Sequence, residues 1–171
     1  YISLRDVEIK EALFPLRLRP VQLKTACRWA AMIDRLLPPN IAQKSLLGHY
    51  FWHSKMLCSS RNTGGVEWRF FWRWLHSWGS APDLTRCLNC GTRISEGYWY
   101  VQGMYCPACV QRVAEVAEDG FWLGKDSLQT LYKAAILPRK EFFSWHHLKE
   151  AERFAWSQWI SILRRMLETC R

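Results

Sequence analysis

Apolar residues recur every three or four positions through most of this chain, which is the spacing of amphipathic α-helices. One such pattern begins at Pro20, a residue tolerated in the first turn of a helix, and stops at Pro38–Pro39. We expect these residues of that helix to face a core: Leu23, Ala26, Cys27, Ala30, Ile33, Leu36 and Leu37. A second helix is predicted over about 41–57, with these residues inward: Leu46, Leu47, Tyr50, Phe51 and either Met56 or Leu57.

The third predicted helix, Val66–Trp78, is unusually aromatic. Its apolar stripe consists of Phe70, Phe71, Trp74, Leu75 and Trp78. Aromatic residues interleaved with arginines can stack on nucleobases, and Arg69 and Arg73 provide that interleaving. A large aromatic core or an interface explains the same pattern, and a core is the better interpretation of the stripe. Gly79 is expected to end the helix.

Three more helices are predicted in the last third of the chain. A short one begins at Pro107, and the next is capped by Asp126 or Ser127, followed by a basic turn at Arg139–Lys140. The last helix, about Ser144–Thr169, repeats apolar residues at helical spacing over seven turns, which suits the central strut of a helical bundle. Its predicted core residues are Leu148, Ala151, Ala155, Trp159, Ile162, Leu163 and Met166.

The first eighteen residues follow a different pattern. Ile2, Leu4, Val7 and Ile9 are spaced as in one or two short strands, and Pro15 interrupts whatever precedes it. A lone strand is not stable by itself. The segment therefore pairs with strands from elsewhere or is the last part of another domain. The expected fold class is mainly α, a helical bundle with a short strand at its start.

Four of the seven cysteines form two C-x-x-C pairs, and these add a candidate metal site. Cys87 and Cys90 are one pair, Cys106 and Cys109 the other, with fifteen residues between the pairs. Each pair can aim two thiolates at one point, and two pairs complete the tetrahedron that Zn²⁺ prefers. Gly91 can take the positive φ that such a turn needs, and YWYVQGMYC is typical of a β-hairpin joining the two pairs.

Disulfide bonds or plain burial would also account for these four cysteines. Both fit less well, because Cys27, Cys58 and Cys170 are scattered and make the total odd, which favours a reducing compartment. Four thiolates leave no open coordination position. The predicted zinc ion is therefore structural, and it stabilises an insertion at 84–110 that has little core of its own.

The formal net charge of +9 favours an acidic partner, such as nucleic acid, an acidic protein tail or an anionic membrane surface. A basic protein without such a partner is the alternative. The candidate nucleic-acid contacts are cations of the first two predicted helices and their flanks: Arg17, Arg19, Lys24, Arg28, Lys44, Lys55 and Arg61.

No apolar run reaches the roughly 20 residues of a membrane span, and the first residues lack the apolar core of a signal peptide, so we expect a cytoplasmic protein without a membrane partner.

No catalytic constellation is apparent, and we expect a binding protein instead of an enzyme. The sequence has no glycine-rich phosphate loop and no G-x-S-x-G motif. His49 and His53 are spaced to bind a metal on one helix face but lack a third ligand nearby, so a surface or packing role is the better interpretation. His76 could pair with Cys87 as base and nucleophile, but Cys87 is better used as a zinc ligand.

The order of these features resembles the bacterial recombination mediator family RecO. The resemblance rests on FFWRWLHSWGSAPDLTRCLNCG, then the hairpin, then MYCPAC, then WLGKDSLQTLYKA and the long last helix. The opening YISLRDVEIKEALFPLRL also resembles the end of that family's N-terminal OB-fold. The resemblance thus implies that residues 1–18 are the tail of an OB-fold and that residues 19–171 form a helical domain containing the zinc insertion.

The resemblance implies a role in DNA repair and homologous recombination. Members of the RecO family bind single- and double-stranded DNA and anneal complementary strands. They contact the tail of single-stranded DNA-binding protein and work with RecR to load RecA, at the nucleoid in the cytoplasm. By likeness, Cys87, Cys90, Cys106 and Cys109 are zinc ligands. The OB-fold that carries much of the DNA binding is nearly absent here, so a zinc-stabilised protein-interaction module without DNA contact remains the alternative. A cryptic Cys/His enzyme is a third hypothesis.

Overall fold

The structure, a computed structural model, describes residues 12–37, 43–61, 63–100, 103–113, 120–146 and 156–169. Most of these residues are helical, as the apolar spacing predicts. The helices are α1 (Phe14–Arg17), α2 (Pro20–Leu36), α3 (Lys44–Ser59), α4 (Gly64–Ser77), α5 (Pro107–Val110), α7 (Lys125–Ile136), α8 (Arg139–His146) and α10 (Trp156–Thr169). The strands are β1 (Gly97–Tyr100), β2 (Gly103–Tyr105) and β3 (Phe121–Leu123).

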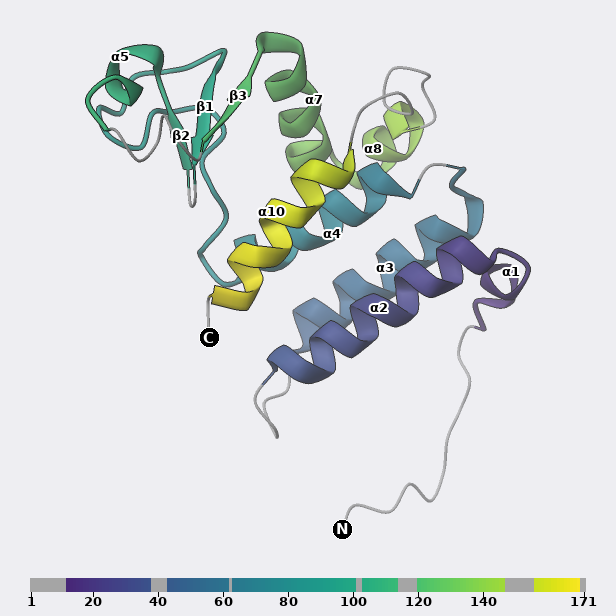
Figure 1. Ribbon diagram of the computed structural model, residues 1–171. Helices are drawn as coiled ribbons and strands as arrows, with labels where there is room; N and C mark the ends of the chain where they lie inside the picture. The colour runs from purple at the N-terminus through teal and green to yellow at the C-terminus, as the bar shows by residue number, and fades with distance from the viewer. Residues whose placement is uncertain are drawn as a thin grey trace.

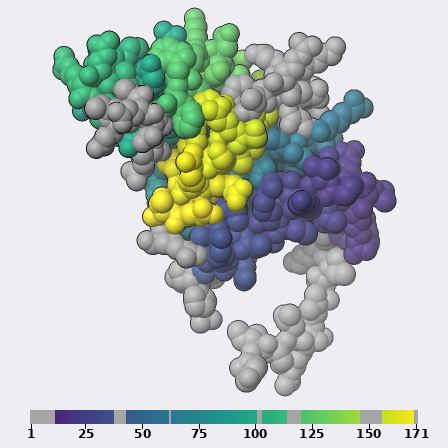
Figure 2. Space-filling view, viewed as in Figure 1, coloured from purple at the N-terminus to yellow at the C-terminus, as the bar shows by residue number. Residues whose placement is uncertain are grey.

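Helix α4 lies at the centre of the helical part and contacts α3, α7 and α10 (Figure 1). Helices α2 and α3 form a neighbouring layer, and α10 lies along α4 on the side toward the sheet. In the space-filling view, α10 separates the cysteine-rich segment from α2 (Figure 2). The arrangement is a helical bundle that carries a small sheet at one end.

The aromatic composition of α4 explains its central place. Every residue from Gly65 to Leu75 except Arg73 is buried, so the helix has no wide solvent face. Trp29 of α2 stacks on Phe70 with ring centroids 4.5 Å apart, and Trp156 of α10 packs near Trp68 at 6.4 Å. The core interpretation of the aromatic stripe is thus confirmed, and burial extends to Trp68 and Trp72 as well.

Three predictions about the last helices are wrong. Asp126 and Ser127 do not cap α7, because the helix begins at Lys125 and Gly124 stands at its N-cap without a side-chain hydrogen bond. The final helix is not the central strut, because α4 is buried on more sides and α10 covers one of them. Arg139 and Lys140 do not form a turn but the first two residues of α8. The described core residues of the last helix, Trp159, Ile162, Leu163 and Met166, are buried as predicted. Residues 147–155, including Leu148, Ala151 and Ala155, lie outside the described part.

The inward faces of α2 and α3 are rotated from the predicted ones. On α2, Ala26, Ile33 and Leu36 are buried as expected, but Trp29 and Met32 share the core face while Cys27 and Ala30 are exposed. On α3, Leu47 and Phe51 are exposed, and His53 and Ser54 take inward positions beside Met56 and Leu57. Apolar residues lie on most sides of α3, so periodicity alone does not single out one face.

Helix α4 ends at Gly79 as predicted. Gly79 has φ +73°, and its N–H donates to the carbonyl of His76 at 3.1 Å. The N–H of Ser80 donates to the carbonyl of Leu75 at 2.9 Å. This is the Schellman pattern, in which a left-handed residue satisfies the last carbonyls of a helix and turns the chain away. The turn sends the chain from α4 into the first cysteine pair.

The three strands form an antiparallel sheet in the order β2-β1-β3. Trp99, Met104 and Leu123 are buried on its inner face, where the Trp99 and Phe121 rings lie 6.2 Å from the Trp159 ring of α10. The predicted hairpin is therefore confirmed. Strand β3 was not predicted, because three residues are too few to show an alternation.

The segment before α2 contains a helical turn, α1, which contacts both α2 and α3. Leu16 on this turn is 4% exposed and belongs to the bundle core. The predicted strands with Ile2, Leu4, Val7 and Ile9 lie outside the described residues. The domain boundary between residues 18 and 19 stays a prediction.

Candidate metal centre and cationic surface

The structure brings all four predicted metal ligands together. The Sγ atoms of Cys87, Cys90, Cys106 and Cys109 lie within 4.8 Å of one another, and those of Cys90 and Cys106 are 3.8 Å apart. A tetrahedron with Zn–S bonds of about 2.3 Å places its sulfur atoms about 3.8 Å apart. The six described cysteines are all free thiols, so disulfide bonds among the four are not formed. The donor set and spacing suit an ion such as Zn²⁺.

Local backbone geometry aims the first pair. Gly91 adopts φ +71°, as its place after the pair predicts, and its N–H donates to the Cys87 carbonyl at 2.9 Å. The N–H of Cys87 in turn donates to the carbonyl of Thr92 at 2.9 Å. These bonds close a tight turn in which both thiols point to one side.

The hairpin supplies the second pair. Cys106 follows β2 directly and precedes α5, whose first turn contains Cys109. The N–H of Cys109 donates to the Cys106 carbonyl at 3.0 Å, and the N–H of Leu88 donates to the Met104 carbonyl at 2.7 Å. The second bond joins the two pairs through the backbone, so the site has a scaffold besides the metal.

Hydrogen bonds shift the acidity of these thiols unequally. Hydrogen bonds with the side chain and backbone of Thr92 lower the pKa of Cys90 to about 6. Burial acts to raise the pKa of Cys87, but backbone N–H groups, first that of Cys106, outweigh it and lower the pKa. The Asn89 amide acts to lower the pKa of Cys109, but neighbouring thiols and burial raise it to about 11. Binding of a metal ion would deprotonate all four thiols, whatever their separate pKa values in its absence.

The helical bundle and its cysteine cluster lie within a segment that matches a known family. Residues 23–157 match the family described as recombination protein O C terminal. The chain belongs to the RecO family. RecO proteins are recombination mediators, and the match covers α4, the cysteine pairs and the sheet. Comparison with curated proteins and comparison with solved structures each gave no match.

The cations predicted to contact nucleic acid do not form one site in this RecO-family chain. Arg19 donates to the carbonyl of Ser60 at 2.9 Å, which brings the start of α2 to Arg61. Arg17 lies over the Phe14 ring at 5.2 Å at the same end of these helices. Lys44 lies at the opposite end of α3, a helix of 16 residues that is about 24 Å long.

The other predicted contacts divide between structural and surface positions. Arg28 donates to the buried carboxylate of Glu67 at 2.6 Å, and Trp29 donates to the same oxygen at 3.3 Å. That ion pair fixes α2 against α4, so Arg28 has a structural partner. Lys24 is exposed on α2, and Lys55 is exposed on α3. Their contact with nucleic acid stays a prediction.

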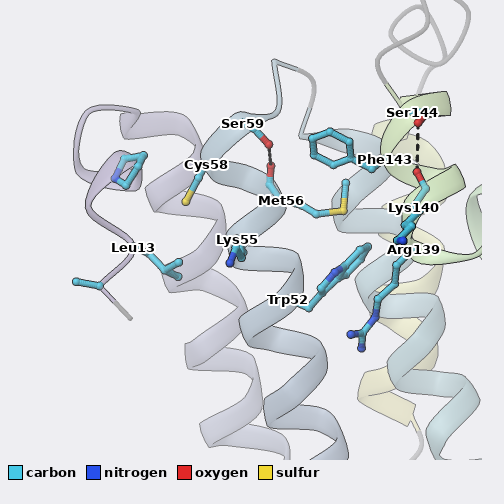
Figure 3. Close-up of a pocket in the computed structure, with 12 residues that line it drawn as sticks. Leu13, Trp52, Lys55, Met56, Cys58, Ser59, Arg139, Lys140, Phe143 and Ser144 are labelled. Atoms are coloured by element: carbon cyan, nitrogen blue, oxygen red, sulfur yellow. Dashed lines mark hydrogen bonds between the residues drawn. The ribbon is translucent and has the colours of Figure 1, made fainter. Parts of the chain in front are cut away.

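An apolar pocket of about 730 Å³ opens between α1, α3 and α8 (Figure 3). Trp52 and Met56 of α3 and Phe143 of α8 supply apolar surface, and Lys55, Arg139 and Lys140 add cations. Figure 3 shows the Trp52 ring and the Arg139 side chain lying between α3 and α8. No sequence pattern indicates this pocket, because its residues come from three separate segments.

Three arginines from α4 and α8 form a cationic cluster that the sequence does not reveal. Arg69 and Arg73 of α4 lie one turn apart, and Arg139 of α8 approaches them. The spacing of Arg69 and Arg73 is visible in the sequence, but the approach of Arg139 depends on how α8 packs.

Among the described residues, no helix of this RecO-family chain is long and apolar enough to cross a membrane.

Proposed function

We propose that this chain acts in DNA repair and homologous recombination as a RecO-type mediator that binds DNA and repair proteins. The observation that carries the proposal is the family match over residues 23–157. The net charge of +9 supports an acidic partner, and exposed cations lie on both α2 and α3. On this proposal the chain binds single- and double-stranded DNA without catalysing a reaction.

The proposed partners are those that the family likeness implies. They are the C-terminal tail of single-stranded DNA-binding protein and RecR, with annealing of complementary strands and RecA loading as the outcome. The proposed site of action is the bacterial cytoplasm at the nucleoid. The proposed cofactor is one structural Zn²⁺ held by Cys87, Cys90, Cys106 and Cys109, with no open position for a substrate.

Strand annealing tests this function. Two complementary oligonucleotides, one with a fluorophore and one with a quencher, are first coated with single-stranded DNA-binding protein and then mixed. The chain is expected to speed their annealing. If annealing is no faster than in its absence, and fusing an OB-fold to the N-terminal side of Tyr1 does not change this, the proposal is wrong.

The pocket favours a second candidate, a protein-interaction module without direct DNA binding. Its apolar lining can accept an aromatic side chain, and Lys55, Arg139 and Lys140 can pair with carboxylates. A short acidic peptide that ends in phenylalanine has both features. The pocket is therefore the proposed site for the tail of single-stranded DNA-binding protein.

Peptide binding measured by fluorescence polarisation tests the pocket. Phe143 is 43% exposed, so Phe143→Ser should lower peptide affinity while leaving the fold intact. Phe14→Ser is the matched control, because Phe14 is 61% exposed and does not line the pocket. Equal affinities for the two variants would exclude the pocket as the peptide site.

A further inference from the structure

Three guanidinium groups gather where α4, α7 and α8 meet, and only one of them has a structural explanation. Arg69 is 2% exposed and donates to the carbonyls of Ala134 at 2.7 Å and Leu137 at 2.6 Å. These carbonyls end α7, where a cation also complements the helix dipole. Its guanidinium lies 4.4 Å from the centre of the Phe142 ring. Arg69 therefore fixes the end of α7 to α4.

Arg73 and Arg139 make no ion pair and no hydrogen bond within the described part. Their guanidinium groups instead lie over indole rings, Arg73 over Trp72 at 5.7 Å and Arg139 over Trp52 at 5.1 Å. The imidazole of His76 stacks on Trp72 with ring centroids 5.1 Å apart. Arg139 and His76 are exposed and Arg73 is half-buried, so these groups face solvent with their donors available.

The positive charges in this arrangement act against one another. Burial lowers the pKa of Arg73, and the charge of Arg139 lowers it further. Burial likewise lowers the pKa of His49, and the positive charges of Arg139, Arg73 and Arg69 add to the effect. No carboxylate acts in the opposite direction at either group. In addition, Arg139 lies in the first turn of α8, the end of a helix that disfavours cations.

A cluster of cations that repel one another is neutralised by an anion. We propose that Arg73, His76 and Arg139 bind the phosphodiester backbone of single-stranded DNA, an assignment that rests on the proposed DNA-binding function. A guanidinium group over an indole ring uses no hydrogen-bond donor in that contact, so its donors remain free for two-pronged contact with phosphate oxygens. His49 lies among the same cations.

The extent of positive charge favours a polyanion over a single carboxylate. Helix α3, which carries His49, contains no acidic residue, and Lys55 on it lines the neighbouring pocket. On the α8 side, Lys140 follows Arg139, so this turn keeps a net positive charge beside Glu141. A nucleic acid presents a charge at every residue of its backbone, so it can follow such a surface. An acidic peptide is the competing ligand, because Arg139 also lines the apolar pocket.

The test compares two double variants with equal loss of charge. Arg73→Gln/Arg139→Gln alters the cluster, and Arg112→Gln/Arg165→Gln removes two exposed arginines outside it. Affinity for fluorescein-labelled oligothymidylate is measured over a series of salt concentrations. The cluster variant should lose about tenfold in affinity per arginine. The slope of log affinity against log salt should become shallower by about 0.7 per arginine. The control should change much less.

Folding is monitored by circular dichroism, and the cluster variant should melt no lower than the parent chain because a repulsion is removed. A third variant, Arg73→Lys/Arg139→Lys, keeps the charge and should recover most of the salt slope. If the parent chain binds oligothymidylate and the two Gln variants bind it equally, the cluster assignment is wrong while the function stands. The cluster assignment is also wrong if the cluster variant loses only acidic-peptide binding. If the parent chain does not bind, both proposals fail.

Discussion

Gly64, the first residue of α4, lies directly against the side chain of Trp156 on α10. A Cβ atom at this position would lie 2.5 Å from the Cβ and 2.6 Å from the Cγ of Trp156. The atoms in the way belong to the base of a large buried side chain, which cannot move aside cheaply. The absence of a side chain at residue 64 therefore allows α10 to pack on α4.

Substitution of this glycine should destabilise the protein. We expect Gly64→Ala to lower the free energy of unfolding by about 1–3 kcal/mol, as overpacking does elsewhere. Gly48→Ala is the control, because nothing lies within 4 Å of a Cβ there and alanine favours a helix by up to about 1 kcal/mol. Urea unfolding measures both, and equal effects would contradict the packing argument.

His53 connects a buried side chain to the pH dependence of stability. It is 1% exposed, its Nδ1–H donates to the His49 carbonyl at 2.6 Å, and burial lowers its pKa well below 6.5. Below pH 6.5 the unfolded chain therefore binds a proton that the folded chain excludes. The free energy of unfolding should fall as pH drops through this range, by up to about 1.4 kcal/mol per pH unit from this residue.

The measurement is urea unfolding at pH 7.5 and 5.5 for the parent chain and for His53→Asn, whose amide can still donate to the His49 carbonyl. Protonation of the cysteine ligands affects both proteins, so the difference between them isolates His53. The variant should lose less stability on acidification. An identical loss would show that His53 is protonated in the folded state.

Some residue roles were predictable from the sequence and others were not. The role of the four clustered cysteines as metal ligands could be predicted, because C-x-x-C spacing is a local property of the chain. A surface or packing role for His53 was inferred from the lack of a third ligand, and the structure shows that the side chain is packed in the core. The capping role of Arg69 was not predictable, because its acceptors lie at residues 134 and 137, about 65 positions away.

At the scale of elements, long helices with one apolar stripe were predicted best. The bounds of α2 match the prediction because prolines define both ends, and α4 matches because glycine ends it. Short elements were missed or misplaced. Strand β3 has three residues, and α8 begins at a basic pair that resembles a turn. Elements of this length depend on contacts with the rest of the fold.

The cysteine-rich segment should depend on metal for its order. Under reducing conditions, EDTA is expected to lower the melting temperature and increase hydrogen exchange over residues 84–110, because metal binding contributes to folding free energy. Elemental analysis should give one zinc per chain. Cys90→Ser should lower zinc content, whereas the control Cys27→Ser alters an exposed thiol outside the cluster and should not. Full order without bound metal would contradict the structural role.

At the scale of the whole molecule, composition predicted the class of the fold but not its arrangement. Helical periodicity and the cysteine pairs indicate a bundle with an insertion, which the structure shows. The central position of α4 instead of the last helix could not be derived, since both have strong apolar faces. Helix α4 takes the central position because buried residues, many of them aromatic, lie on nearly every side of it.

Charge is distributed over the molecule in a way that suits a polyanionic partner. The described ion pairs, Arg28 with Glu67 and Arg35 with Glu168, use few of the 24 lysines and arginines. Arg73 and Arg139 have no acidic partner in the described part. If the chain is a DNA-binding mediator, its affinity should be governed by release of counterions from phosphates.

The central claim is tested most directly by the salt dependence of single-stranded DNA binding by this 171-residue chain. Affinity for labelled oligothymidylate is measured by fluorescence polarisation across a series of salt concentrations. With three or more phosphate contacts, log affinity should fall linearly with log salt, with a slope of about −2 or steeper. Binding that does not respond to salt, or no binding even at low salt, would contradict a DNA-binding role for the helical domain.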